Sequence, residues 1–509
     1  MKPNIYPLLL VLLITQLVIS CNKEVTNFTD LFNQNISSKS PPQFTSLQVI
    51  MNKSGIAPLA GNITYKSDQI VNFKYTVKGQ DGLNFIHRKD GFSDNGIDNL
   101  FALYPDYTNE IKFTITNSLG YSRDSIIYIS TPKLSIGMPD QSNIIVNAPT
   151  TINAKTNFLL LYIVKTLNSA FINDPTTQKP IIIDKFGKIR GFLDIPNVLE
   201  MKPLPNGHYL YYKSMNFNEI DLLGNVYHTV VPPNPCHHDF EILPNGNIIY
   251  TGEDQSINQT IEDKIYEINY KSGAIVNTIN LYNVFDPTRQ TLPSITNIDW
   301  LHNNSLCYDK TDNTLLLTAR NQSLIAKIDM YSKKLSWMIS DSSYWNSSLK
   351  SILLQPTGAN FENSYGEHSV RTSPYDHNKI IIFDNGNARS YTHALTLAKS
   401  YSRLVEYTID PTTQQVSQSF DFGKQLGSAT YTNATGNVDY LTQDDFLINF
   451  GFIIKDVNGN TAADGATSMR LMEVNRQGNV NMDITIKNTD PNNPLNGFRS
   501  YRAHSINFF

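Results

Sequence analysis

Cysteine is scarce in this chain, which contains only Cys21, Cys236 and Cys307 among its 509 residues. Three cysteines cannot build the network of disulfides that holds small secreted domains together. A hydrophobic content of 40% and an aromatic content of 11% instead provide ample apolar surface for a packed core. We therefore expect a globular fold that depends on the burial of apolar side chains.

Two further features are missing from the sequence. No run rich in lysine or arginine occurs, and the formal net charge is −4 at pH 7. A nucleic-acid partner needs a concentrated positive surface, so this composition argues against one and favours small molecules as ligands. The apolar pattern typical of helices is almost absent, so we expect an all-β protein.

The start of the chain has the features of a secretory signal peptide. Lys2 precedes an apolar stretch, Tyr6–Ile19, which is too short to span a bilayer comfortably. A small residue directly before Cys21 resembles the cleavage motif of bacterial lipoproteins, although an ordinary secretory signal is the alternative. We predict a lipoprotein signal peptide at 1–20 and a flexible polar tether at 21–41, whose lipidated Cys21 anchors the chain to the cell envelope, in the periplasm or at the cell surface.

The next part of the chain, residues 42–135, consists of short segments with alternating apolar and polar side chains. Examples are FTSLQVIM, VNFKYTVK and NEIKFTITN, and Gly, Asp and Asn separate these segments. This pattern is typical of the strands of a β-sandwich. We therefore predict a small N-terminal β-sandwich domain.

Residues 136–509 contain recurring units in which a turn precedes a strand, as in LPNG followed by HYLYY or by NIIYTG. Steps of 39, 67, 65 and 67 residues separate the first strand positions of five such units, which are His208, Asn247, Thr314, Lys379 and Phe446. A propeller blade of four strands needs about 40 residues or more, so these steps fit blades with insertions. A further blade from residues near 155–195 and the chain ends gives a predicted six-bladed β-propeller.

Three histidines occupy the same place in successive units. His238, His302 and His368 lie 9, 12 and 11 residues before the strand positions of their units. If they lie on the innermost strands, their side chains converge in the axial funnel, where propellers bind ligands. The alternative is that each histidine is an ordinary core or surface residue. His237 should face the opposite side of its strand and serve packing.

The neighbours of these histidines narrow the chemistry. Three imidazoles can bind zinc, but Arg320, at the end of the strand after His302, would repel a cation unless an anionic substrate lay between them. An arginine with histidines better suits an anionic ester, whose oxygens the guanidinium binds while imidazoles attack or protonate. A salt bridge is the alternative role for Arg320. Trp300 is a candidate apolar wall for an aromatic substrate, with blade packing as its alternative.

Several motifs, in order, carry a resemblance to a known family. The stretches HHDFEILPNGN, DWLHNNS, DNTLLLTARNQ and EHSV, together with SGIAPLAGNITYK and LYPDYTNEIKFTITN, resemble the bacterial aryl-sulfate sulfotransferases, which need no nucleotide sulfate donor. The resemblance covers roughly residues 42–509. It implies a six-bladed propeller that moves a sulfuryl group from an aryl sulfate to another phenol by a ping-pong mechanism.

The resemblance also implies roles for individual residues. The transiently sulfated histidine falls on His368, the other funnel histidines on His238 and His302, and the sulfate-binding residues on Arg320 and Asn304. It implies phenols and aryl sulfates as partners, no metal or diffusible cofactor, and a homodimer. The close cysteine pair of some family members is not evident here. An aryl sulfate hydrolase and a noncatalytic surface-binding lipoprotein remain as alternatives.

Overall fold

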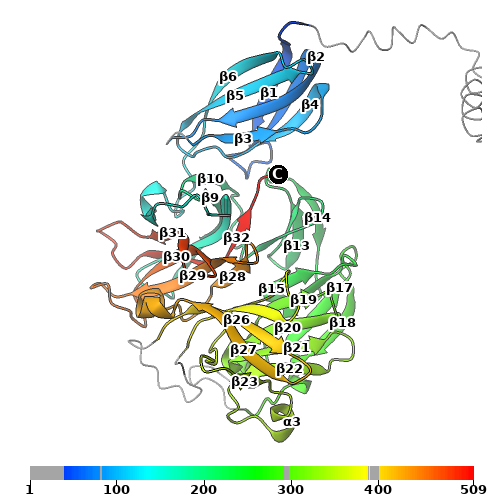
Figure 1. Ribbon diagram of the computed structural model, residues 1–509, viewed down its shortest axis with the longest axis vertical. Helices are drawn as coiled ribbons and strands as arrows, with labels where there is room; N and C mark the ends of the chain where they lie inside the picture. Colours follow the sequence, from blue (N-terminus) through cyan, green and yellow to red (C-terminus); the bar gives the residue numbers. More distant parts are fainter. Residues whose placement is uncertain (1–38, 81–82, 290–296, 388, 390–399) are drawn as a thin grey trace, which may run out of the picture. The chain divides into compact units, whose positions relative to one another are not determined.

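The computed structural model describes residues 39–80, 83–289, 297–387, 389 and 400–509 (Figure 1). The predicted signal peptide and Cys21 lie outside these residues. Within them, no helix has the length and apolar character needed to cross a bilayer. Contacts divide the chain into two compact units, one comprising the chain up to Val49 with Ile63–Asp98 and Glu110–Tyr128, and one comprising Ile50–Asn62, Asn99–Asn109 and Ile129–Phe509.

The N-terminal strands form one hydrogen-bonded sheet that folds over into two layers. Its strands are β1 (Phe44–Met51), β2 (Gly61–Val77), β3 (Phe85–Arg88), β4 (Ser93–Leu100), β5 (Thr108–Asn117) and β6 (Ser122–Ser130), and β2 pairs with β1, β3, β4 and β5. Tyr65 and Phe73 both belong to β2, yet their rings stack at 4.3 Å. Eight residues of a straight strand would span about 26 Å, so β2 turns back on itself and its halves face each other across the core. This arrangement is the predicted sandwich.

Six further sheets follow, and each contains at least four strands that pair in antiparallel order. Three of them consist of four strands consecutive in sequence, one combines three consecutive strands with the last strand of the chain, and the other two have a fifth strand. The first three of these sheets along the chain are β11 (Met201–Pro203), β12 (Tyr209–Lys213), β13 (Asn216–Ile220) and β14 (Val226–Val230); β15 (Cys236–Ile242), β16 (Ile248–Gly252), β17 (Lys264–Ile268) and β18 (Ile275–Asn280); and β19 (Asn303–Asp309), β20 (Thr314–Ala319), β21 (Leu324–Asp329) and β22 (Leu335–Ser340).

The remaining sheets contain strands that sequence periodicity did not predict. They are β24 (Ser369–Thr372), β25 (Lys379–Asp384), β26 (Arg403–Asp410) and β27 (Gln415–Phe422) with the parallel β23 (Gln355–Thr357); β28 (Asn437–Tyr440), β29 (Asp445–Lys455), β30 (Ala466–Asn475) and β31 (Val480–Lys487) with β7 (Ile144–Ala148); and β8 (Phe158–Thr166), β9 (Asn173–Asp184) and β10 (Ile189–Phe192) with β32 (Gly497–Ile506). Short helical turns connect them, including α3 (Ser347–Lys350), η1 (Gln141–Asn143), η2 (Leu281–Asn283), η3 (Asn297–Asp299), η4 (Arg320–Gln322) and η6 (Lys424–Thr430).

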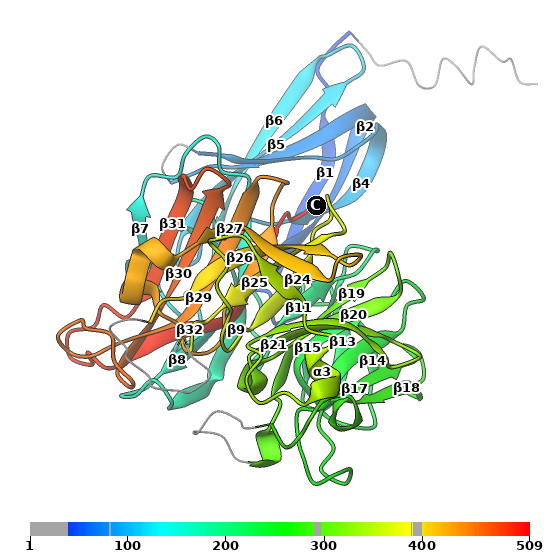
Figure 2. The ribbon, with the colours of Figure 1, turned by 60° about the horizontal axis from the view of Figure 1, so that its bottom comes forward.

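The last strand of the chain completes the sheet that begins near residue 158. Ile506 of β32 pairs with Phe158 of β8, and Gly497 pairs with Thr166. Figure 2 shows β32, in red, beside β8. The expectation that the chain ends share a sheet and close the ring is therefore met by a long antiparallel pairing.

Each of the six sheets has one innermost strand, and polar side chains on these innermost strands contact one another. Lys202 of β11 donates to Asp239 of β15 at 2.7 Å, and Arg502 of β32 donates to the carbonyl of Asn304 of β19 at 3.1 Å. On the other strands, Arg371 of β24 lies 3.7 Å from Asp439 of β28, which in turn accepts from His504 of β32 at 2.9 Å. These strands surround a common axis, and the predicted all-β sandwich and propeller class is confirmed.

Candidate active site

The three predicted histidines lie at equivalent places, where the innermost strands of three sheets begin. His238 is near the start of β15, and His302 and His368 directly precede β19 and β24. Innermost strands of neighbouring sheets are adjacent at this end of the axis, so the shared register brings the side chains into one region. His238 and His302 contact each other directly, with their ring centroids 4.6 Å apart.

His237 belongs to the same cluster, so the prediction that it faces away and serves packing is wrong. Its ring meets the ring of His238 edge-on at 3.9 Å, and its Nε2 lies 2.6 Å from Glu262. The alternation of side chains fails here because His238 has a φ of 56° and the pairing of β15 with β16 shifts between Cys236 and Phe240. This bulge turns two consecutive imidazoles toward one carboxylate.

Glu262, which sequence reasoning missed, is the centre of this histidine cluster. Its carboxylate lies 2.6 Å from His237 Nε2, 3.3 Å from His238 Nε2 and 2.5 Å from His302 Nδ1. Burial would raise the pKa of Glu262, but its contacts with the three imidazoles outweigh burial and hold its pKa far below the usual value. Glu262 is therefore the anionic centre of this cluster.

The pKa values of His302 and His238, which both contact this carboxylate, are shifted in opposite directions. Burial alone would lower the pKa of His302, but its contacts with Asp299, at 2.8 Å, and with Glu262 raise the pKa above the usual histidine value. Burial and the neighbouring His237 instead lower the pKa of His238 well below that value. The side chains of His238 and His302 meet through their Nε2 atoms at 3.0 Å. These opposite shifts favour a proton on His302 over a proton on His238.

His368 is held in one tautomer. Its Nδ1 lies 3.0 Å from the carbonyl oxygen of Gly366 and 2.8 Å from Oδ1 of Asn385. The Asn385 amide nitrogen donates to the carbonyls of Thr432 and Thr435, so its oxygen is the atom that faces the imidazole. Both neighbours of Nδ1 are acceptors, so Nδ1 carries the proton and Nε2 carries the lone pair.

The surroundings of His368 also keep it neutral. The residue is 2% exposed, and burial followed by the positive charge of Arg320 lowers the pKa of His368 well below its usual value. A neutral imidazole with an unprotonated Nε2 is the form that acts as a nucleophile.

Arg320 offers an unpaired positive charge to the same region. It follows β20 directly, and its two contacts are long ones, 3.4 Å to Oδ1 of Asn321 and 3.5 Å to the carbonyl of Asn433. Its Nε is buried without a hydrogen-bond partner, and within the described ranges no carboxylate forms an ion pair with it. The alternative role of Arg320 as half of a salt bridge is thus not what the structure shows. An unpaired buried guanidinium suits an anionic ligand.

Asn304 is fully buried, with a side chain that already has partners. Its amide nitrogen donates to the carbonyl of Glu367 at 2.8 Å, and its Oδ1 accepts from Thr318 at 2.7 Å. Because Glu367 precedes His368, the amide ties the nucleophile candidate to β19. Within the described part of the chain this amide nitrogen donates to one acceptor, so its second N–H is available to a ligand oxygen.

Trp300 does not line the funnel, and the prediction that it forms an apolar wall is wrong. It is 1% exposed, packs among the apolar residues between the β15 and β19 sheets, and donates its indole N–H to Asp263 at 2.8 Å. The residue lies between η3 and β19 rather than in a strand, so the two-residue alternation used to place it beside His302 does not apply there.

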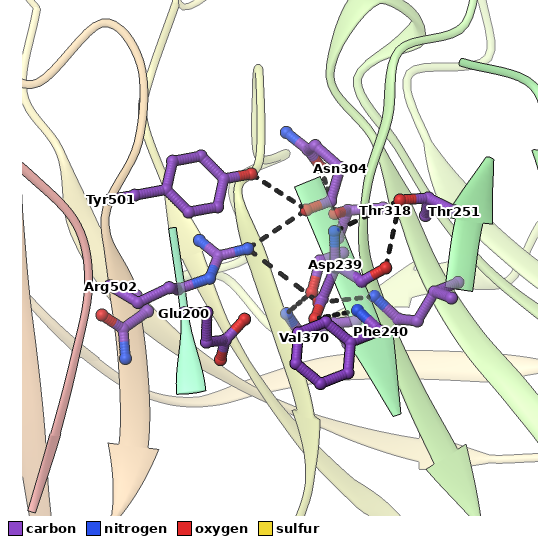
Figure 3. Close-up of polar contacts among 12 residues, drawn as sticks. Glu200, Asp239, Phe240, Thr251, Asn304, Thr318, Val370, Tyr501 and Arg502 are labelled. Atoms are coloured by element: carbon purple, nitrogen blue, oxygen red, sulfur yellow. Dashed lines mark hydrogen bonds and ion pairs between the residues drawn. The ribbon is translucent and has the colours of Figure 1, made fainter. Parts of the chain in front are cut away.

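Tyr501 of β32 is the aromatic side chain at the site that sequence reasoning left out. Its ring stacks on His238, with centroids 5.7 Å apart and an interplanar angle of 9°, and its hydroxyl lies 3.4 Å from the carbonyl of Asn304. Figure 3 shows Tyr501 and Arg502 reaching the same carbonyl from one side while Asp239 lies on the other. The closing strand therefore supplies part of the site.

A network of buried charged side chains, centred on Asp239, lies next to these residues. Asp239 accepts from Lys202 at 2.7 Å and from the backbone of Leu306 at 2.9 Å, and Arg502 lies 4.0 Å away (Figure 3). Burial opposes ionisation of Asp239, but Lys202, Arg371 and Arg502 outweigh it and lower the pKa of Asp239. The network links the four innermost strands β11, β15, β19 and β32.

The same side chains include atoms that could bind a metal. His237, His238 and Glu262 offer donor atoms within 4.8 Å of one another, as do Glu262, Asp299 and His302. Each of the three imidazoles already contacts a carboxylate. The nearby guanidinium of Arg320 further disfavours a cation, so the donor set fits proton transfer better than metal binding.

The fold and the site together define a β-propeller protein whose axial site combines a neutral histidine, imidazoles on a carboxylate and an unpaired arginine. Residues 142–499 match the family model described as arylsulfotransferase (ASST), and residues 48–132 match the arylsulfotransferase Ig-like domain. The chain belongs to the arylsulfotransferase family.

Curated relatives agree with this assignment. Arylsulfate sulfotransferase AssT of Escherichia coli O6:H1 (strain CFT073) is 24% identical over 517 residues, which cover 81% of this chain and 86% of that protein. AssT of Lelliottia amnigena is 25% identical over 324 residues, or 52% of each chain.

Solved structures are more distant. A protein of unknown function from Bacteroides caccae has a TM-score of 0.40 at 12% identity, covering 68% of this chain and 98% of that one. The β-propeller domain of Cps50 (Swd1) from Myceliophteria thermophila has a TM-score of 0.33 at 10% identity, covering 68% of this chain and all of that domain. Neither adds to the interpretation of the site.

Proposed function

We propose that the protein transfers a sulfuryl group from an aryl sulfate to a second phenol by a ping-pong mechanism, with His368 as the residue that carries the group. No nucleotide sulfate donor takes part. Support comes from the family, from the anion-binding character of Arg320 and, above all, from the tautomer of His368. The two acceptors at Nδ1 leave the lone pair on Nε2 with no rearrangement needed.

In the first half-reaction, Nε2 of His368 forms a bond to sulfur while the bond from sulfur to the phenolic oxygen breaks. The oxygen leaves with the electron pair and takes a proton from an imidazole of the cluster. In the second half-reaction the acceptor phenol attacks sulfur, the N–S electron pair returns to Nε2, and the phenolic proton passes to the imidazole that gave one up.

Arg320 and Asn304 contribute by positioning and charge. Sulfuryl transfer, by analogy with phosphoryl transfer, passes through a loose transition state, so fixed donors facing the nonbridging oxygens provide most of the stabilisation. The long contacts of Arg320 leave its N–H groups available for these oxygens.

The proposed intermediate can be trapped with the donor alone. Incubation of the protein with 4-nitrophenyl sulfate, followed by digestion and mass spectrometry under conditions that preserve the labile N–S bond, should place SO3 on His368. Replacement His368→Asn should abolish the adduct and lower turnover by more than about 10³-fold. His228→Asn is the matched control, because the side chain of His228 contacts the carbonyl and ring of Tyr270 in a different part of the propeller.

A burst of nitrophenol without any SO3 adduct on His368 would contradict the covalent mechanism. Full turnover by His368→Asn would contradict the role of His368, whereas no turnover by the wild type would favour a noncatalytic binding protein that has only the fold of the family. An aryl sulfate hydrolase would use the same residues with water as acceptor. Product analysis with and without added phenol decides between transfer and hydrolysis.

We propose in addition that Cys21 is lipidated and that the protein is anchored to the cell envelope as a homodimer. The support is the signal-like start of the sequence and the family resemblance. Cys21→Ala should release the protein from the membrane fraction and abolish the incorporation of labelled fatty acid. Light scattering of the purified protein determines the oligomeric state.

A further inference from the structure

We propose that Glu262 and Asp299 hold a proton on His302 and that this proton is the one delivered to the departing phenolate oxygen. The inference rests on the proposed transfer reaction. Glu262 and Asp299 act through His302, so they are positioning residues, whereas His302 is the acid. His238 has a different role from His302: it stays neutral and accepts a hydrogen bond from the protonated His302.

The protons of the cluster follow from which atoms face each other. Nδ1 of His302 lies 2.5 Å from Oε2 of Glu262 and 2.8 Å from Oδ2 of Asp299. A nitrogen facing two ionised carboxylates must carry its hydrogen, because a lone pair there would be repelled by both.

At the other side of the ring, Nε2 of His302 lies 3.0 Å from Nε2 of His238. Two lone pairs would repel at this distance and two N–H groups would clash, so one proton lies between the two nitrogens. The protonation of Nδ1 together with this second proton makes the His302 ring an imidazolium if the proton belongs to His302.

The charges around the two rings assign that proton to His302. Two carboxylates contact His302 directly, whereas His238 has Glu262 only at the longer distance of 3.3 Å and has His237 against its ring. The ring centroid of His237 lies 6.2 Å from that of His302, His368 interacts electrostatically with His302, and Arg320 interacts with the same two carboxylates. None of these contacts His302 as closely as the carboxylates do, and the pKa of His302 is accordingly raised while that of His238 is lowered.

This arrangement explains why one glutamate faces three imidazoles. When Nε2 of His302 gives its proton to the phenolate, the ring becomes neutral and keeps Nδ1–H on the carboxylates. These hydrogen bonds hold the ring while its Nε2 faces the lone pair of His238, and this repulsion favours the return of a proton to Nε2. The proton of the acceptor phenol then returns to Nε2. His237 supplies a further hydrogen bond that fixes the Glu262 carboxylate during this cycle.

The contribution of an acid depends on the basicity of the leaving phenolate. 4-Nitrophenolate is a weak base and leaves with little help, whereas unsubstituted phenolate is a stronger base and needs the proton. We therefore expect Glu262→Gln and Asp299→Asn to lower kcat with phenyl sulfate by about 10²-fold or more, and kcat with 4-nitrophenyl sulfate by less than about tenfold.

Glu267→Gln is the matched control. Glu267 lies in β17, close along the chain to Glu262, but its carboxylate accepts from Asn247 at 2.7 Å. This change should leave both substrates unaffected. An equal loss of kcat with both substrates in Glu262→Gln, or a loss that appears only in KM, would overturn the proposed role of the acid.

A second measurement does not depend on turnover. NMR titration of the protein with 15N-labelled histidine, assigned by His302→Asn, should show His302 titrating above the usual histidine range in the wild type and at least one pH unit lower in Glu262→Gln. An unchanged His302 midpoint would overturn the inference. If the wild type transfers sulfate from neither ester, the proposed function fails, while the titration still confirms or overturns the retention of the proton.

Discussion

A substitution of Arg320 should abolish activity without lowering the stability of the protein. The substitution Arg320→Met removes the guanidinium and keeps most of the apolar length of the side chain. In the native state the guanidinium is largely buried, its Nε lacks a partner, and its two hydrogen bonds are 3.4 Å and 3.5 Å long. We expect this variant to be inactive but not destabilised.

The expected magnitudes follow from the contacts of Arg320. A buried polar group without a partner costs about 1–3 kcal/mol, so its removal should leave the free energy of unfolding unchanged or raise it by up to about that amount. Two charge-assisted hydrogen bonds to sulfuryl oxygens contribute about 1.5–3 kcal/mol each. Their loss predicts a decrease in kcat/KM of about 10²–10⁴-fold.

Thermal unfolding monitored with and without sulfate, together with steady-state transfer from 4-nitrophenyl sulfate, tests both parts. Sulfate should raise the midpoint of the wild type and leave that of Arg320→Met unchanged, because ligands stabilise only the state that binds them. Arg371→Met is the control with the opposite expectation: Arg371 lies 3.7 Å from Asp439 and 3.8 Å from Glu200, so its removal leaves buried carboxylates uncompensated. A destabilised Arg320→Met variant, or one that retains activity, would refute the reasoning.

Three further predictions concern pH, the core and the axial network. In the pH profile of kcat/KM with phenyl sulfate, activity should fall on the alkaline side only above the usual histidine pKa, because His302 loses its proton as pH rises through its raised pKa. On the acid side, activity should fall only below the usual histidine pKa, because the pKa of His368 is lowered and its nucleophilic form persists to lower pH. Trp300→Phe should destabilise the protein by about 1–3 kcal/mol in chemical denaturation and change KM by less than about twofold, and a large KM effect would restore Trp300 to the substrate wall. Asp239→Asn leaves Lys202 without its nearest charge partner and should cost about 3–5 kcal/mol by the same measurement.

The strands and the histidine register could be predicted because they depend on local pattern. Turn sequences followed by alternating side chains marked the second strand of five sheets, and counting back from them placed His238, His302 and His368 at equivalent positions. The two added strands β7 and β23 escaped prediction because each pairs with a strand far away in the sequence, and nothing in its own few residues records that partner.

The rest of the site lies where the alternation of side chains along a strand does not apply. His237 turns inward because a bulge and a positive φ at His238 cancel the alternation of β15. Glu262 and Asp299 lie outside the strands, where periodicity carries no information, although the three-residue spacing from Asp299 to His302 was visible in the DWLH motif. Sequence reasoning therefore identified the nucleophile candidate and missed the carboxylates that set the charge of its neighbours.

The closing strand shows why the site could not be derived from its three central sheets alone. Arg502 and the hydroxyl of Tyr501 both reach the carbonyl of Asn304, whose side-chain amide donates to the carbonyl of Glu367, the residue before His368. A continuous set of hydrogen bonds thus runs from β32 through β19 to the nucleophile candidate, while the ring of Tyr501 stacks on His238. Since β32 comes from the end of the chain and pairs with β8, closure of the ring also completes the site. The geometry of the imidazoles is therefore a property of the closed propeller, and the residues that fix it are distributed over its full length.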